Sequence, residues 1–160
     1  MAHYAEYYRV KSLATERDTL FVFVAPSATT LERSLYWIGG WRPTTAFHLI
    51  YSESSIHFEF GRVSELQCET VKEGNAISEQ LSEWQAGAFE MIGACTNLDM
   101  NMGSLVSVLK TADDLRLRKV GKVVKPLTPQ QAVEVLIAAA ELQFGVRGWR
   151  MNQDRRHGNV

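Results

Sequence analysis

The feature that most constrains this chain is a Gly-Gly pair between two segments with helical spacing. Residues 31–51 read LERSLYWIGGWRPTTAFHLIY. Gly39 and Gly40 predict the end of one helix, because glycine adopts the left-handed conformation that helix C-termini often require and lets backbones approach closely. Pro43 predicts the first turn of a second helix, since its fixed φ is helical and its missing N–H would be unpaired there. The segment is therefore predicted to be a helix, a tight corner and a second helix.

The helix before the corner has its own start signal. Thr29 and Glu32 have the spacing of a capping box, in which each side chain accepts a hydrogen bond from the backbone of the other residue. Leu31, Leu35 and Ile38 recur at helical spacing after it. We expect these three side chains to form the inner, core-facing side of the helix.

The rest of the sequence also predicts helices. Apolar residues recur three or four positions apart over 63–91, which indicates one long helix. Thr128, Pro129 and Gln131 supply an N-cap, a first-turn proline and a capping-box partner for the last helix. The predicted helices outside the corner are 2–17, 63–91, about 105–124 and 128–145, separated by a turn at 95–97 and a loop at 100–103, with a frayed polar tail after Trp149.

One short segment has an ambiguous pattern. Residues 21–24 read FVFV, whose β-branched and aromatic content favours a strand. Pro26 ends the run, and no second strand is available to pair with it. We therefore predict a buried extended linker. With 160 residues, 46% of them hydrophobic, and no repeat or linker, the chain is predicted to form one all-α domain: a single antiparallel helical bundle with one long central helix.

The run WIGGWRPTTAFHLIYS, at 37–52, resembles the signature of the plant Delay-of-Germination family, whose domain is shared with TGA-type basic leucine zipper transcription factors. Blocks at 3–18, 63–85 and 112–149 resemble other helices of that family. The resemblance implies a Delay-of-Germination/TGA-like helical domain over 1–149, followed by a basic polar tail over 150–160. It also implies that an N-terminal helix and an internal loop near 60–61 are missing here, which would expose apolar surface and favour self-association.

Charge and catalytic motifs exclude several classes of function. The formal net charge of −1 gives no general attraction to DNA or to anionic membranes. The long helix is acidic and the segment 110–125 is basic, so the two are expected to pack against each other or to face solvent. The histidines are scattered, and neither a nucleophile motif nor metal-ligand spacing occurs, so an enzyme is not expected. Two cysteines and no apolar run of spanning length indicate an intracellular protein, in the nucleus or the cytoplasm or both.

The resemblance raises the question of haem, because some relatives in the dormancy branch are associated with haem through two histidines in the last helix. The matching positions here are Gln143 and Arg147, which ligate iron poorly, so no cofactor is expected by that route. A second hypothesis is a hydrophobic small-molecule site, with lipid or haem as ligand. It depends on the aromatic residues Phe21, Phe23, Trp37, Trp41, Phe47 and Tyr51.

What remains is a non-enzymatic plant regulatory adaptor. The resemblance implies a role in transcription or in development such as seed dormancy, with a type 2C protein phosphatase or a transcription coactivator as partner. Calmodulin is a further candidate partner for the basic segment 112–125, and a homodimer is another possibility. The leucine zipper of the TGA relatives lies outside this domain, so sequence-specific DNA binding is expected only in a complex with such factors.

Two groups of residues carry the site predictions. The first shapes the corner, so Gly39→Val is predicted to unfold the domain, and Arg42 is expected to pair with a buried acceptor. It comprises Trp37, Gly39, Gly40, Trp41, Arg42 and Pro43. The second group could contact a partner and comprises Arg42, Thr44, His48, Arg116, Arg118, Lys119 and Lys122.

Overall fold

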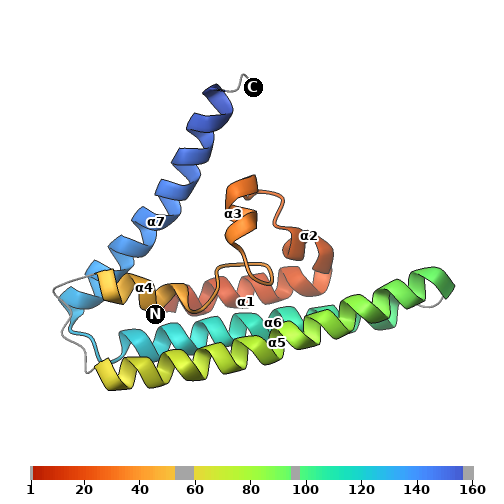
Figure 1. The fold of residues 1–160 in the computed structure, drawn as a ribbon, viewed down its shortest axis with the longest axis horizontal. Helices are drawn as coiled ribbons and strands as arrows, with labels where there is room; N and C mark the ends of the chain where they lie inside the picture. The colour runs from red at the N-terminus through yellow and green to blue at the C-terminus, as the bar shows by residue number, and fades with distance from the viewer. Residues whose placement is uncertain (1, 53–59, 95–97, 157–160) are drawn as a thin grey trace.

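The computed structural model describes residues 2–52, 60–94 and 98–156, and these are helical almost throughout (Figure 1). Within these ranges, the sole β-type pairing is an isolated bridge between Tyr36 and Trp41. The predicted all-α class, with one long helix in a single bundle, is confirmed. The helices are α1 (Ala2–Arg17), α2 (Thr19–Val24), α3 (Thr30–Leu35), α4 (Thr45–Ser52), α5 (Phe60–Ala94), α6 (Leu98–Val124) and α7 (Pro129–Arg156).

The two long helices α5 and α6 form the frame of the molecule. They lie side by side and run in opposite directions in Figure 1, and α1 packs on α6. The 35 residues of α5 span about 50 Å at the usual helical rise. Helix α7 leaves this pair at an angle and makes its contacts with α3 and α4. In the described ranges, no helix has the length and apolar character needed to cross a membrane.

Buried apolar side chains gather in two clusters, one beneath the Gly-Gly corner and one where α4, α5, α6 and α7 meet. Removing each such side chain from water stabilises the fold by about 1.5–3 kcal/mol. The corner cluster comprises Trp37, Ile38, Ile77, Leu105, Val108, Leu109, Ala112 and Leu115. The end cluster comprises Phe47, Ile50, Val63, Val123 and Val135.

The prediction of a buried extended linker at 21–24 is wrong in conformation, and it is wrong in burial at Phe21 and Val24. The segment is helix α2, and the side chain of Phe21 is 60% exposed. Asp18 caps this helix by accepting a hydrogen bond from the backbone N–H of Phe21 at 2.9 Å. Ala25 ends it in the left-handed conformation, with φ of 48°. Caps at both ends outweighed the β propensity of the sequence, which had no strand to pair with.

The corner follows the predicted order but begins earlier than predicted. Thr29 and Glu32 form the predicted capping box, and α3 then ends at Leu35, before the glycines. Leu35 is 47% exposed, so the predicted inner face of α3 is wrong at that position. Ile38 is buried but lies in the corner itself, where its φ is 49°. Helix α4 begins at Thr45, so the prediction that Pro43 lies in the first turn of this helix is wrong, because Pro43 is in the turn that precedes it. Helix, corner and helix still follow one another in the predicted order.

Two predicted boundaries are wrong in the second half of the chain. The predicted loop at 100–103 is part of α6, which begins at Leu98, and α7 continues past Gly145 and Trp149 to Arg156. An interior glycine costs a helix about 1 kcal/mol and does not by itself end it. The predicted turn at 95–97 lies outside the described residues. The backbone N–H of Thr128 donates to Gln131 Oε1 at 3.0 Å, and the backbone N–H of Gln131 donates to Thr128 Oγ1 at 3.3 Å, which confirms the predicted start of the last helix.

Candidate functional site

A buried arginine holds the corner in place. The guanidinium of Arg116, on α6, donates from Nε to the carbonyl of Trp41 at 2.7 Å and from Nη2 to the carbonyl of Ile38 at 2.9 Å. It also donates to the carbonyl of Trp37 and to Asp113, and its Cζ lies 5.3 Å from the Trp37 ring centroid. These three carbonyls belong to the corner that follows α3, so one buried cation fixes the path of the backbone there.

Lys11 joins α1 to the same network. Its Nζ donates to Asp113 at 2.8 Å and to the carbonyl of Gly39 at 2.8 Å. Burial lowers the pKa of Lys11, and the neighbouring Asp113 carboxylate opposes that shift. Asp113 thus accepts from two buried cations, Lys11 and Arg116, and one acid links α1, α6 and the corner.

Helix α7 is fastened to the corner through Gln143. Its side-chain oxygen accepts from Trp41 Nε1 at 2.6 Å, and its amide donates to Glu32 at 2.6 Å. Glu32 is 1% exposed, so this pairing also satisfies a buried carboxylate. Gln143 therefore has a structural contact at one of the two positions matched to haem ligands, while Arg147, at the other, is exposed on α7.

The acidic and basic helices pack against each other, which confirms the first of the two alternatives considered for their charges. Lys119 is fully buried and lies 2.6 Å from Glu73 and 3.0 Å from Glu69. Arg118 pairs with Glu73 at 2.9 Å, and Lys122 pairs with Glu69 at 3.2 Å. Hydrogen bonds from Lys119 hold the pKa values of both glutamates below their usual range. Arg118, Lys119 and Lys122 of α6 therefore all form ion pairs with glutamates of α5.

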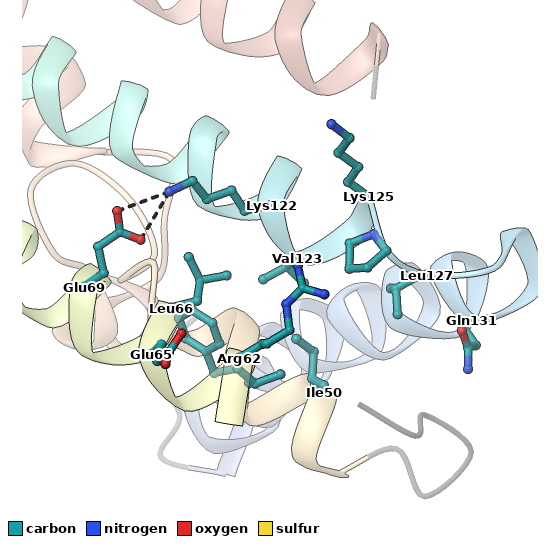
Figure 2. A pocket seen from close by; sticks show the side chains of 13 residues that line it. Ile50, Arg62, Glu65, Leu66, Glu69, Lys122, Val123, Lys125, Leu127 and Gln131 are labelled. Carbon is teal, nitrogen blue, oxygen red and sulfur yellow. Dashed lines mark hydrogen bonds and ion pairs between the residues drawn. The ribbon is translucent and has the colours of Figure 1, made fainter. Parts of the chain in front are cut away.

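At the end of the bundle, α4, α5, α6 and α7 line an open hollow of about 890 Å³ (Figure 2). Phe47 and Ile50 come from α4, and the other lining residues come from the start of α5, the end of α6, the segment between α6 and α7, and the first turn of α7. Figure 2 shows the Lys122–Glu69 ion pair on one side and Leu127 with Gln131 on the other. The apolar lining residues are Phe47, Ile50, Val63, Leu66, Val123, Pro126 and Leu127, and the polar ones are Arg62, Glu65, Glu69, Lys122, Lys125 and Gln131.

This hollow combines an apolar floor with a charged rim. Its volume falls within the ~300–1,000 Å³ of typical ligand sites, and similar hollows receive the anchor side chains of partner proteins. In the part of the chain that the structure describes, no group of three or more His, Cys, Asp or Glu residues could hold a metal ion. The arrangement is therefore suited to binding through shape and charge.

The predicted contact residues lie in different environments. Arg42 and His48 are exposed and Thr44 is half-buried. Arg42 and Thr44 border a small hollow of about 30 Å³ beside α5, and His48 does not. Arg42, which was predicted to pair with a buried acceptor, is exposed and lies over the Trp37 ring, 6.0 Å from its centroid. The corner carbonyls accept from Arg116.

The predicted basic patch and aromatic cluster are both divided by the fold. Arg116 and Lys119 are buried inside the bundle, while Arg118 and Lys122 remain partly exposed. Of the six aromatic residues considered for a small-molecule site, Phe47 alone lines the large hollow. Phe23 and Trp37 pack in the corner cluster, while Phe21 and Tyr51 are exposed.

Several residues that the site depends on were not singled out from the sequence. Asp113 lies three positions before Arg116, a spacing that favours an ion pair on a helix and could have indicated it. Lys11 lies 102 positions from Asp113, and no local pattern connects them. Leu66, on α5, and Leu127, in the connection between α6 and α7, line the hollow and have no signal beyond hydrophobicity.

Comparison with known proteins identifies relatives of this chain. A family model described as seed dormancy control matches residues 1–52. Protein DOG1-like 4 of Arabidopsis thaliana is 26% identical over 178 residues, an alignment that covers 97% of this chain and 75% of the relative. Protein RESPONSE TO ABA AND SALT 1 of the same plant is 29% identical over 173 residues. That alignment covers 92% of this chain and 74% of the relative.

The transcription factors are a second group of relatives. Transcription factor TGA3 of Arabidopsis thaliana is 30% identical over 154 residues, which cover 87% of this chain. The chain spans only 40% of the length of TGA3. Together with the family match, these similarities confirm the resemblance to the Delay-of-Germination family and to the domain that it shares with TGA factors.

Proposed function

From this relationship to Delay-of-Germination and TGA proteins, we propose that the chain is a non-enzymatic plant regulatory domain that acts by binding other proteins. Its role is linked to transcription and to developmental control such as seed dormancy, in the nucleus or the cytoplasm. The names of the relatives support this proposal, since one is a transcription factor and another is named for a hormone and salt response. The structural observation that carries it is the hollow at the end of the bundle.

The hollow is the proposed docking site for the partner. A buried floor that includes Phe47 and Ile50 can receive a bulky apolar side chain and remove it from water. The surrounding charges, among them Glu65 and Lys125, can fix the orientation of the partner and exclude partners of the wrong charge. A type 2C protein phosphatase and a transcription coactivator are the first partners to test.

Calorimetric titration of purified candidate partners into this chain tests the proposal. Leu66→Glu places a charge on the apolar lining without removing a fully buried side chain, because Leu66 is half-buried. We expect it to weaken binding at least about tenfold. Phe89→Glu is the matched control, since Phe89 lies on the same helix outside the hollow and is 81% exposed. Equal affinities for the two variants would contradict docking at the hollow.

The mixed lining also favours a second candidate function, the binding of an amphiphilic small molecule. An apolar ligand body could occupy the floor, while an anionic end could reach Lys122 or Lys125. Native mass spectrometry of the purified chain, followed by titration with an anionic and a neutral amphiphile of equal chain length, tests this candidate. Binding that is unaffected by Leu66→Glu would exclude the hollow as the ligand site.

A further inference from the structure

The walls of the hollow limit the kind of protein segment that can bind there. A segment that adds a strand needs a free sheet edge, and a proline-rich segment needs a groove lined by several aromatic rings. In the described part of the chain, the β-type pairing is confined to Tyr36 and Trp41, and neither residue lines the hollow. Phe47 is the single aromatic residue among the described residues that do. The hollow offers instead an apolar floor between helices, which is the kind of surface that receives an amphipathic helix.

The hollow has room for more than one apolar side chain. An enclosed apolar cavity of roughly 150 Å³ is large enough for one benzene ring. The open hollow measures about 890 Å³, with Phe47 fully buried on its floor and Leu66 and Leu127 half-buried at its sides. Apolar side chains three or four positions apart lie on the same face of a helix, so two or three of them can enter the hollow together.

The charges around the hollow leave a basic group without a partner. Glu69 accepts from Lys122 at 3.2 Å and lies 3.0 Å from Lys119, so two lysines compensate its charge. Lys125 is exposed, and no carboxylate of the described residues forms an ion pair with it. Figure 2 shows Lys125 at one edge of the hollow and Glu65 at the opposite edge.

The lining as a whole has a surplus of positive charge. It contains three basic side chains and two acidic ones, which gives a net charge of +1. A partner that brings a carboxylate to Lys125 complements this surplus, whereas a partner with lysine or arginine at the same place is repelled. The charge of the hollow therefore favours an acidic segment over a basic one.

We propose that the occupant of the hollow is an amphipathic helix of another protein, which inserts two or three large apolar side chains and places an aspartate or glutamate beside Lys125. The inference rests on the proposed function, because it specifies the chemistry of the partner that docks at the hollow. The apolar side chains supply most of the affinity. The exposed ion pair contributes selectivity and makes the affinity depend on salt.

Selection from a displayed peptide library tests this chemistry before a natural partner is known. The library holds alanine-based peptides of about 18 residues, long enough to form a helix, with one face and its flanks randomised. Peptides that bind the wild type but not Leu66→Glu should carry large apolar residues three or four positions apart. Asp or Glu should be enriched at least about threefold over Lys or Arg at one flank.

Charge reversal then tests the role of Lys125. Lys125→Glu should reverse the enrichment in favour of Lys or Arg, with an unchanged circular dichroism spectrum because the side chain is exposed. Lys72→Glu is the matched control, since Lys72 is an exposed lysine of α5 outside the hollow, and it should leave the enrichment unchanged. In calorimetric titrations, a selected acidic peptide should bind the wild type about two- to fivefold more tightly than Lys125→Glu, as expected for one exposed ion pair.

The outcomes separate this inference from the proposed function. Peptides retained equally by the wild type and by Leu66→Glu would overturn both, because the hollow would not be the docking site. Peptides that depend on Leu66 but show no acidic preference, or a preference that Lys125→Glu leaves unchanged, would overturn the inference alone. Peptides that depend on Leu66 but lack helical spacing of their apolar residues would also overturn it.

Discussion

At the scale of the residue, the corner depends most on the contacts of Arg116. A single guanidinium binds three carbonyls of the corner and the Asp113 carboxylate, and it is 4% exposed. Removing one partner of such a buried set leaves the others desolvated and unpaired, which costs more than the loss of a surface pair. The corner is therefore expected to be unusually sensitive at this position.

Arg116→Met is predicted to lower the free energy of unfolding by about 3–5 kcal/mol, because it leaves three corner carbonyls without their donor and Asp113 with Lys11 as its one remaining cation. Urea unfolding followed by circular dichroism measures the change. The matched variant Arg118→Met removes an exposed arginine of the same helix and should cost no more than about 1 kcal/mol. Similar losses for the two variants would show that the buried network contributes little.

Gly39 is required for a conformation that other residues rarely adopt. Its φ is 67°, and a Cβ added there would lie 3.0 Å from Leu109 Cδ2. Gly39→Ala is predicted to cost about 2 kcal/mol, and the larger Gly39→Val should unfold the domain. Gly87→Ala is the control, because nothing lies within 4 Å of its added Cβ and alanine favours helix. Thermal melts should move in opposite directions for the two alanine variants, and a stabilised Gly39→Ala would contradict the structure.

At the scale of the element, we expect the stability that α5 gains by pairing with α6 to decrease in acid. The pKa values of Glu69 and Glu73 lie below their ordinary value of 4.5, chiefly because Lys119 donates to them, with Lys122 or Arg118 also contributing. The unfolded chain therefore binds more protons than the folded chain in acid. The stability from these carboxylates is present above about pH 4.5 and is lost as the pH falls through the lowered values.

The double variant Glu69→Gln/Glu73→Gln is accordingly predicted to flatten the acid dependence of stability. Urea midpoints measured between pH 7 and pH 3 should fall less steeply for this variant than for the wild type. Glu79→Gln/Glu83→Gln changes two exposed carboxylates of the same helix and should retain the wild-type slope. An unchanged slope in the first variant would indicate that other groups govern the response to acid.

Helix starts were predictable because their signals are local. The capping boxes at Thr29–Glu32 and Thr128–Gln131 involve residues three positions apart, and both form as predicted. Helix ends and the conformation of segment 21–24 were not predictable in this way. They depend on groups that are distant in the chain, or on helix caps that outweigh the β propensity of the residues. The corner that follows α3 is held by Arg116, which lies 78 positions from Ile38. A local sequence pattern cannot predict a contact between residues so far apart in the chain.

At the scale of the whole molecule, the candidate site forms only when several helices of the chain pack together. Each helix at the end of the bundle contributes only a few ordinary residues, and the hollow forms where α4, α5, α6 and the start of α7 converge. Sequence reasoning predicted Phe47 as part of an aromatic cluster, but it could not place Leu66 beside Leu127. It did recognise the family, because the signature at 37–52 is continuous in the chain.

The surface that the molecule offers to a partner protein is the hollow. It is concave, with a buried floor, and suits the anchor side chain of another protein.

The most direct test of partner docking is amide hydrogen exchange of this chain alone and with a saturating amount of a partner that binds it. The account predicts added protection in α4, in the first turns of α5 and at the start of α7, around the residues that line the hollow. Amides of α2, on another part of the molecule, should exchange as before. Protection confined to α1 and α2, with none around the hollow, would contradict the proposed site.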